Sequence, residues 1–153
     1  MSGCRRMMGW TKLAGITAAA LVLSSGTAWA GSWLEEPEGW AYQEDGNTVS
    51  GWNRIDNIWY YMDTGTGLWQ EKPSVNEENA PYLVENAMIR AGLYQDEKED
   101  IEYRAGYSTK DTVEVLVGWE EKPGEFHSIN TFDVNKKTGT AKSRVTKEEY
   151  AVY

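Results

Sequence analysis

The sequence predicts an α+β fold in which two stacked aromatic β-hairpin repeats precede a small two-layer domain. That domain is expected to hold one helix on a three- or four-stranded antiparallel sheet. Three observations predict this. Trp and Tyr recur at an interval of 19 residues between positions 32 and 69. Apolar residues follow a helical period between 79 and 92, and alternate with polar ones beyond 101. A helix followed by antiparallel strands is typical of a two-layer α+β domain.

Residues 1–30 have the order of a secretory signal peptide. Three cations open the stretch, residues 13–23 are apolar, and Ala28-Trp29-Ala30 places small residues at positions −3 and −1 of a cleavage site. The apolar run is too short to span a bilayer. We therefore expect export and a mature chain that begins at Gly31, is secreted or cell-wall-associated, and has no membrane contact after cleavage.

The composition excludes several classes of function. The 153-residue chain has a formal charge of −9 and a pI near 4.7, and loss of the leader's three cations would take the charge to −12. A nucleic-acid partner requires a basic face, so it is not expected. Cys4 and His127 are the only residues of their types, which excludes an internal disulfide, a thiolate cluster and a multi-His metal site. Eight Trp and nine Tyr against two Phe favour a half-wet binding surface over a dry core.

The 19-residue interval defines two units, Ser32–Ser50 and Gly51–Trp69. Each is expected to form a β-hairpin, because aromatic residues favour strands while Asp, Asn and Gly favour tight turns, as at Asp56-Asn57 in the second unit. An isolated hairpin is marginal in water, so the two are expected to stack. Trp33 aligns with Trp52, Trp40 with Trp59, Tyr42 with Tyr61, and Gly46 with Gly65.

The second unit resembles the cell-wall-binding repeat, also called the choline-binding or glucan-binding repeat, of exported Gram-positive surface proteins. The resemblance covers residues 32–70 and rests on Gly51-Trp52, Trp59-Tyr60-Tyr61-Met62-Asp63 and the Gly65 or Gly67 that follows. The first copy is degenerate, with Ser32 in place of the Gly and Trp40-Ala41-Tyr42 in place of the triple aromatic.

In that family, aromatic residues of successive hairpins form a cage for the choline of teichoic acids or a platform for glucan. A choline head group neither donates nor accepts hydrogen bonds, so its recognition rests on π-faces worth ~0.5–2 kcal/mol each. One cage of three rings predicts roughly millimolar binding. Two alternatives remain open: the rings only hold the hairpins together, or they meet a protein partner. The resemblance implies a ligand site built from Trp40, Trp52, Trp59, Tyr61 and Trp69.

A polar linker at Gln70–Ser74, which contains Pro73, separates the repeats at 31–72 from a second domain at 73–153. A fragment of residues 74–153 is therefore expected to fold alone, whereas the repeat pair alone is expected to be much weaker. A helix is predicted over residues 79–92, with Pro81 in its first turn and Gly92 just past its C-terminus. Its core face is expected to carry Leu83, Ala87 and Ala91.

Strands are predicted at 101–107, 112–119, 125–134 and 140–146. Phe126 and Phe132 are expected on a common face, and Val113, Val115, Val117 and Trp119 on one face of their own strand. Residues 132–139 also resemble the "Asp/Asn-x-x-Thr-Gly" hairpin of small exported PepSY-like domains. That resemblance, extended over 74–146, implies a helix packed on an antiparallel sheet and a role in peptidase inhibition or protein contact.

No catalytic constellation stands out. His127 lies within a predicted strand without a recognisable nucleophile, and no pair of carboxylates is singled out among 24 acids. The acidic stretch Tyr94–Glu102 is either a calcium site or a solvated loop, and its spacing lacks the Gly turn and final Glu of a hand-type loop. We therefore expect no enzyme activity, no metal and no cofactor.

The sequence thus predicts an exported, non-enzymatic binding protein. Its repeats would contact choline-bearing teichoic acid or glycan of the cell wall, and its second domain a protein or peptide. The alternative is a small exported inhibitor or interaction protein whose repeats are purely structural.

Overall fold

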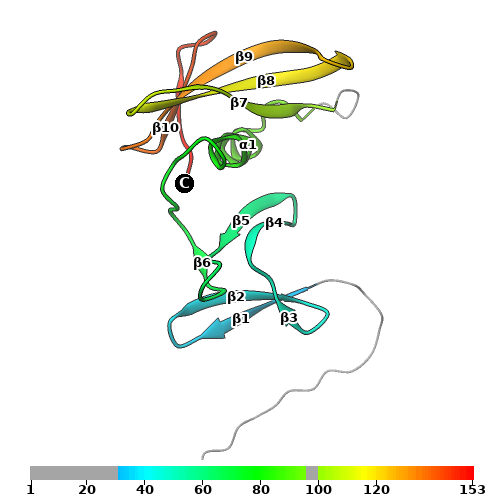
Figure 1. Cartoon of the computed structure of the whole chain (residues 1–153), viewed down its shortest axis with the longest axis vertical. Coiled ribbons are helices and arrows are strands. Elements are labelled where there is room, and N and C mark those ends of the chain that lie inside the picture. The colour runs from blue at the N-terminus through cyan, green and yellow to red at the C-terminus, as the bar shows by residue number, and fades with distance from the viewer. Residues whose placement is uncertain (1–30, 96–99) are drawn as a thin grey trace, which may run out of the picture.

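The computed structural model describes residues 31–95 and 100–153. In these ranges the chain is mostly antiparallel β-structure with a single helix, an α+β arrangement (Figure 1). The leader predicted at 1–30 lies outside the described residues, as does the centre of the acidic stretch, residues 96–99.

The first half forms two three-stranded antiparallel sheets. One contains β1 (Ser32–Glu36), β2 (Gly39–Glu44) and β3 (Asn47–Thr48). The other contains β4 (Gly51–Ile55), β5 (Ile58–Met62) and β6 (Trp69–Gln70). Trp33 faces Tyr42 across β1 and β2, and Trp52 faces Tyr61 across β4 and β5.

The turn predicted between β4 and β5 is confirmed. Asp56 and Asn57 both have positive φ, at 48° and 69°. Two successive left-handed residues match the right-handed twist of a hairpin, and Asp and Asn tolerate that conformation better than other residues with side chains.

The predicted helix is α1 (Ala80–Ala91), with Pro in its first turn. Gly92 ends it in the left-handed conformation, and its N–H donates to the Ile89 carbonyl at 3.1 Å. The predicted core face is only partly right, because Ala91 in the last turn is exposed while Leu83 and Ala87 are buried. The buried helix residues are Ala80, Leu83, Val84, Asn86, Ala87 and Met88.

The second half contains five strands where three or four were expected. They are β7 (Glu102–Ser108), β8 (Thr112–Lys122), β9 (Glu125–Asn135), β10 (Thr140–Ser143) and β11 (Glu149–Ala151), in the order β11-β10-β9-β8-β7. The last predicted strand is shorter than expected because the chain turns back after Ser143, through Lys147 at φ 67°. β11 then pairs with β10.

Phe126 and Phe132 do not share a face, which corrects the prediction. Val117 pairs with Asn130 and Gly118 with Ser128, so Ile129 is an extra residue in β9. Such a bulge reverses the alternation of faces. Gly118 allows the close approach, because a Cβ there would collide with the His127 carbonyl. Phe132 is therefore buried. Phe126 instead packs under Arg104, whose guanidinium carbon lies 4.4 Å from the centre of the Phe126 ring.

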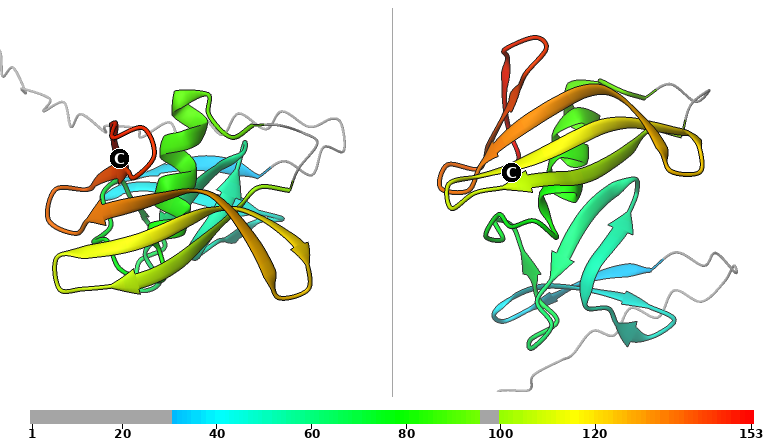
Figure 2. Two further views of the ribbon diagram at one scale, coloured as in Figure 1. Left: turned by 90° about the horizontal axis from the view of Figure 1, so that it is seen from above. Right: turned by 45° about the horizontal axis from the view of Figure 1, so that its top comes forward.

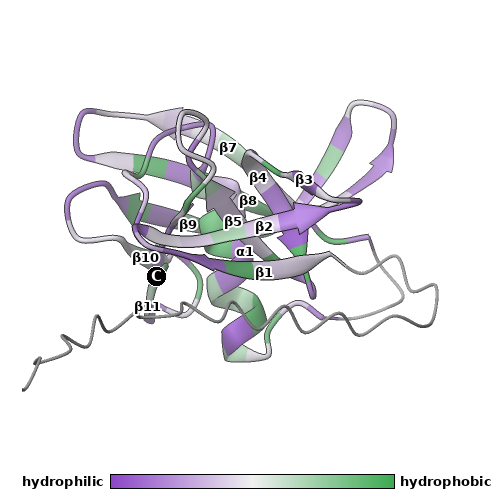
Figure 3. Ribbon diagram, turned by 90° about the horizontal axis from the view of Figure 1, so that it is seen from below, coloured by the Kyte–Doolittle hydropathy of each residue, from purple (hydrophilic) through white to green (hydrophobic). Residues whose placement is uncertain are grey.

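The main core lies between α1 and the five-stranded sheet (Figure 2). Hydrophobic and hydrophilic residues alternate along the long strands of that sheet (Figure 3). Val113, Val115 and Val117 are fully buried as predicted, while Trp119 lies outside this core and packs its ring 4.6 Å from the imidazole of His127.

The second hairpin contacts the helix. Trp52 and Trp59 place their ring centres 5.0 and 4.5 Å from that of Tyr82, in the first turn of α1. At the C-terminus, the Tyr153 hydroxyl donates to the carbonyl of Pro73 in the linker at 2.7 Å. The second hairpin thus contacts the helix of the second half, and separate folding of that half remains a prediction.

Candidate functional site

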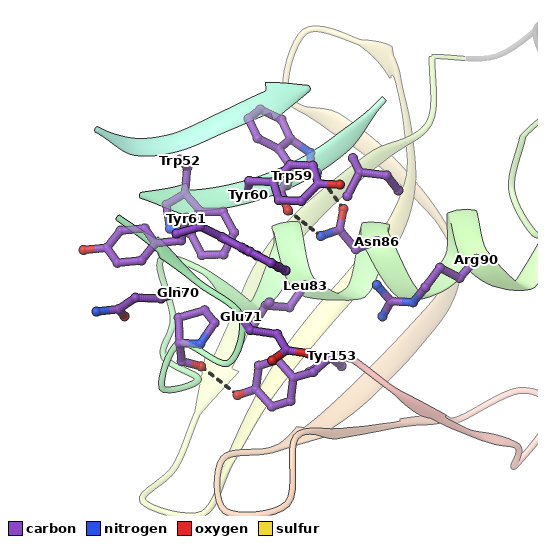
Figure 4. A pocket seen from close by; sticks show the side chains of 14 residues that line it. Trp52, Trp59, Tyr60, Tyr61, Gln70, Glu71, Leu83, Asn86, Arg90 and Tyr153 are labelled. Carbon is purple, nitrogen blue, oxygen red and sulfur yellow. Dashed lines mark hydrogen bonds between the residues drawn. The ribbon is translucent and has the colours of Figure 1, made fainter. Parts of the chain in front are cut away.

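Four of the five predicted ligand residues border one cavity of about 310 Å³ where the second hairpin meets α1 and the C-terminus (Figure 4). They are Trp52, Trp59, Tyr61 and Trp69. Tyr60, Leu83, Asn86 and Tyr153 also line it. A cavity of this size with aromatic walls and few polar groups is typical of a small-molecule site.

Trp40 lies apart from this group. It belongs to the first hairpin, is 44% exposed, and is not among the residues that line the cavity. The structure therefore does not bring all five predicted residues together.

Trp59 has the most contacts of the four. Its indole N–H donates to a Glu85 carboxylate oxygen at 2.7 Å, and the Arg54 guanidinium lies 5.6 Å from its ring centre. Arg54 also pairs with Glu85 at 3.0 Å. Because its ring also contacts Tyr82, Trp59 fixes the hairpin on the helix while it lines the cavity.

Asn86 holds the backbone of the same residue. Its side-chain carbonyl accepts from the Trp59 N–H at 2.8 Å, and its amide donates to the Trp59 carbonyl at 2.7 Å. These are the two bonds that a neighbouring strand would make. The amide of Asn86, buried on α1, thus takes the place of a neighbouring strand at Trp59, in the part of β5 that β6 does not pair with, and sets the position of the aromatic wall (Figure 4).

Trp69 belongs to a second aromatic group, which links the two hairpins. Its ring centre lies 5.7 Å from that of Tyr60 and 6.0 Å from that of Trp33, both in edge-to-face geometry. Trp33 also contacts Tyr60 at 5.0 Å. Trp69 is 36% exposed and lines the cavity, so it offers more open surface than the buried rings of the core.

The cavity carries two opposite charges that the sequence did not indicate. Arg90 extends from the last turn of α1, and Glu71 follows β6. One Arg90 Nη donates to the Ala151 carbonyl at 3.2 Å. Partial burial of the guanidinium lowers the pKa of Arg90 below its ordinary value. Neither residue belongs to the aromatic pattern, so only the tertiary structure identifies them.

A second hollow of about 430 Å³ adjoins the first and shares Trp52, Tyr61, Gln70 and Pro73 with it. Its remaining lining is polar: Thr64, Ser74, Asn76, Glu78 and Asn79. Aromatic faces beside amides and hydroxyls suit the apolar and polar faces of a sugar ring.

The described residues contain no group of three or more His, Cys, Asp and Glu that could hold a metal ion. His127 is exposed on β9. The single helix in residues 31–95 and 100–153, α1, lacks the length and apolar character needed to cross a membrane.

No family model, curated protein or solved structure matches this chain. The choline-binding repeat and the PepSY-like domain therefore remain resemblances based on residues 32–70 and 74–146.

Proposed function

We propose that this protein is an exported, non-enzymatic binding protein that attaches to choline-bearing polymer of the cell wall through the cavity beneath its second hairpin. The observation that carries the proposal is the convergence of Trp52, Trp59, Tyr61 and Trp69 on one cavity of about 310 Å³. In this proposal the two hairpins are degenerate cell-wall-binding repeats, and the α+β domain contacts an exported protein or peptide.

The chemistry of the cavity supports a quaternary ammonium ligand. Its aromatic rings present negative π-faces, and a trimethylammonium group is recognised by such faces and by contact with apolar surface. Two or three such contacts give roughly millimolar affinity. A polymer that carries many choline groups would raise the effective affinity if several protein molecules associated, because their cavities could then bind the same polymer together.

The adjoining hollow favours a second candidate, which is a neutral glycan. It combines Trp52 and Tyr61 with the amide of Gln70 and the hydroxyl of Thr64. A sugar ring would stack on the aromatic wall and exchange hydrogen bonds with these groups.

The contacts of Trp52 and Trp59 with α1 support the alternative in which the repeats are purely structural. Both rings pack on Tyr82, so part of the surface of each ring holds the hairpin against the helix and is not open to a ligand. In that case the protein would be a small exported inhibitor or interaction protein, and the cavity would have no wall ligand.

Retention of the mature protein, residues 31–153, on immobilised choline, immobilised glucan and purified cell wall tests the proposal. We expect retention on choline and wall, with elution by free choline. Trp69→Ala should abolish it, because an open wall of the cavity is lost. Trp40→Ala is the matched control, since Trp40 is exposed outside the cavity, and should be retained like the wild type. Retention on glucan alone favours the glycan, and no retention of the wild type on any of the three contradicts the proposal.

A further inference from the structure

The first hairpin exposes a tryptophan beside a carboxylate. Trp40, near the start of β2, is 44% exposed and is paired across the hairpin with Glu35 of β1, which is also exposed. Residues directly opposite each other on antiparallel strands have their side chains on the same face of the sheet. Glu36 and Glu38, at the turn between the two strands, are exposed as well. This hairpin lies at the end of the molecule opposite the five-stranded sheet (Figure 1).

The carboxylates of the first hairpin have no cationic partner within the described residues. Residues 31–53 contain no Lys or Arg. None of the acids in this stretch forms an ion pair in residues 31–95 and 100–153. These acids are Glu35, Glu36, Glu38, Glu44 and Asp45. Charges of one sign that are not neutralised locally attract a partner of the opposite sign.

The second hairpin contains the cation that the first one lacks. Arg54 stands 19 residues after Glu35 in the sequence. It is paired across its hairpin with Trp59, as Glu35 is with Trp40. The guanidinium carbon of Arg54 lies 5.6 Å from the centre of the Trp59 ring, and one Arg54 nitrogen pairs with Glu85 at 3.0 Å. The second hairpin thus joins an indole, a guanidinium and a carboxylate, whereas the first has an indole and a carboxylate only.

A guanidinium fits this pair of side chains better than other cations. Its flat face can lie on the Trp40 ring while its edge donates two parallel hydrogen bonds to the Glu35 carboxylate. A lysine ammonium pairs as a compact point charge and does not stack in this way. A trimethylammonium group has no N–H to donate, so it would leave the carboxylate without hydrogen bonds.

We propose that Trp40 and Glu35 form a docking site for a basic, arginine-bearing segment of another protein. The guanidinium of the partner takes on Trp40 the place that Arg54 has on Trp59. Further basic residues of the segment are attracted by the two acids of the adjoining turn. This site goes beyond the proposed function, because Trp40 and Glu35 do not line the cavity and need neither choline nor glycan. The formal charge of −9 opposes a second copy of the chain as the partner.

NMR titration of the mature protein with a capped peptide of arginines separated by glycines tests this site. We expect the indole N–H resonance of Trp40 to shift. Trp40→Ala should weaken the peptide about fivefold and Glu35→Gln about threefold, which are the factors that an exposed cation–π contact and an exposed ion pair supply. Glu44→Gln is the matched control, because it removes the same charge from the opposite end of β2, and it should bind like the wild type. A peptide with lysines in place of the arginines should bind more weakly.

A second variant copies the pair found in the second hairpin. Glu35→Arg places an arginine opposite Trp40, as Arg54 stands opposite Trp59. We expect it to abolish peptide binding, because the new side chain occupies the ring and removes the carboxylate. Glu44→Arg makes the same change in charge at the other end of β2 and should leave most of the binding in place. Equal losses in these two variants would show that only the overall charge matters, and would overturn the site.

The remaining outcomes decide the partner. An indole resonance of Trp40 that the arginine peptide does not shift overturns the site. Equal affinity for the arginine and lysine peptides, or a shift of the same resonance by free choline as large as that by the peptide, overturns the assignment to a guanidinium. Self-association of the mature chain that Trp40→Ala abolishes, measured by sedimentation velocity, overturns a foreign partner in favour of a second copy. The proposed function is judged separately, by the effect of Trp69→Ala on retention by choline.

Discussion

The two hairpins share a strand plan but not a set of neighbours. β1 and β4 begin at residues 32 and 51, and β2 and β5 place Trp40 and Trp59 at equivalent positions. Trp40 is 44% exposed, whereas Trp59 is bonded to Glu85 and Asn86 and packs on Tyr82. The two hairpins thus have the same strand positions, while the neighbours of each Trp ring determine whether the ring is exposed or packed.

The other aligned pair, Trp33 and Trp52, also differs in its neighbours. Trp33 in the first hairpin packs on Tyr60 of the second. Trp52 packs instead on Tyr82, which belongs to α1. Tyr82 of α1 thus gives Trp52 an aromatic neighbour, as Tyr60 of the second hairpin does for Trp33. The cavity next to Trp52 is therefore lined in part by residues from outside the hairpins, such as Leu83 and Asn86.

The largest expected effect that tests this contrast is on stability. Trp59→Ala should lower the free energy of unfolding by about 3 kcal/mol, because it removes a large ring from the hairpin–helix contact. The aligned substitution Trp40→Ala should cost less than about 0.5 kcal/mol, as expected for an exposed site. Urea unfolding of the mature protein measures both. Equal losses would mean that the two hairpins are equally coupled to the rest of the chain.

Asn86 is expected to have the next largest effect. Asn86→Ala leaves the Trp59 N–H and carbonyl without the partners they have at 2.8 and 2.7 Å. Leaving such groups unsatisfied costs about 2 kcal/mol. Faster amide hydrogen exchange at Trp59 should accompany the loss, while exchange at Trp40 in the first hairpin should stay the same. Unchanged exchange at Trp59 would show that the amide of Asn86 does not secure β5.

Glu85 should contribute less. Glu85→Gln keeps an acceptor for the Trp59 indole but removes the ion pair with Arg54, so we expect a loss of about 1 kcal/mol or less. Because Arg54 is partly exposed, added salt should shrink the difference between wild type and variant. A difference that is independent of salt would indicate that the hydrogen bond, and not the ion pair, is what matters.

The sequence predicted features that depend on near neighbours in the chain. The Asp56-Asn57 turn, the cap at Gly92 and the buried face of β8 all follow from local conformational preference or a strict period. Phe126 was assigned to the wrong face because one extra residue, Ile129, shifts the phase of β9. Gly118 was the available signal, since a Gly within a strand often marks a bulge.

The candidate site divides in the same way. The 19-residue alignment identified the aromatic residues, four of which border the cavity. The alignment could not identify Asn86, Arg90 or Glu71. These residues lie in the helix and the linker, and their spacing does not show which part of a hairpin will pack against them. The alignment also identified Trp33, as the partner of Trp52. It could not identify the contact of Trp33 with Trp69, because that contact depends on how the two hairpins pack.

The smallest expected effect concerns the turns that lead to the third strand of each sheet. In the first unit, Asp45 and Gly46 form a two-residue turn with φ of 50° and 78°. In the second, the longer segment 63–68 is closed by Asp63, which accepts from the backbone N–H of Thr66 at 2.8 Å and of Gly65 at 3.0 Å. The aligned Glu44 has no such role, because it pairs with Asn47 across a tight turn.

Asp63 should make only the second of these turns sensitive to acid. Hydrogen bonds from the Thr66 backbone, the Thr66 hydroxyl and the Gly65 backbone lower the pKa of Asp63 below its usual value of 3.8. A carboxyl with a lower pKa in the folded state stabilises the fold above the unfolded pKa, and this contribution is lost as pH falls through the folded value. The amide resonances of Gly65 and Thr66 should therefore titrate below pH 3.8 in an NMR series. Asp63→Asn should abolish that titration while it keeps an acceptor, and Glu44→Gln should leave it intact. A midpoint at or above 3.8 in the wild type would show that the carboxylate does not close this turn, and would remove one of the differences between the two hairpins.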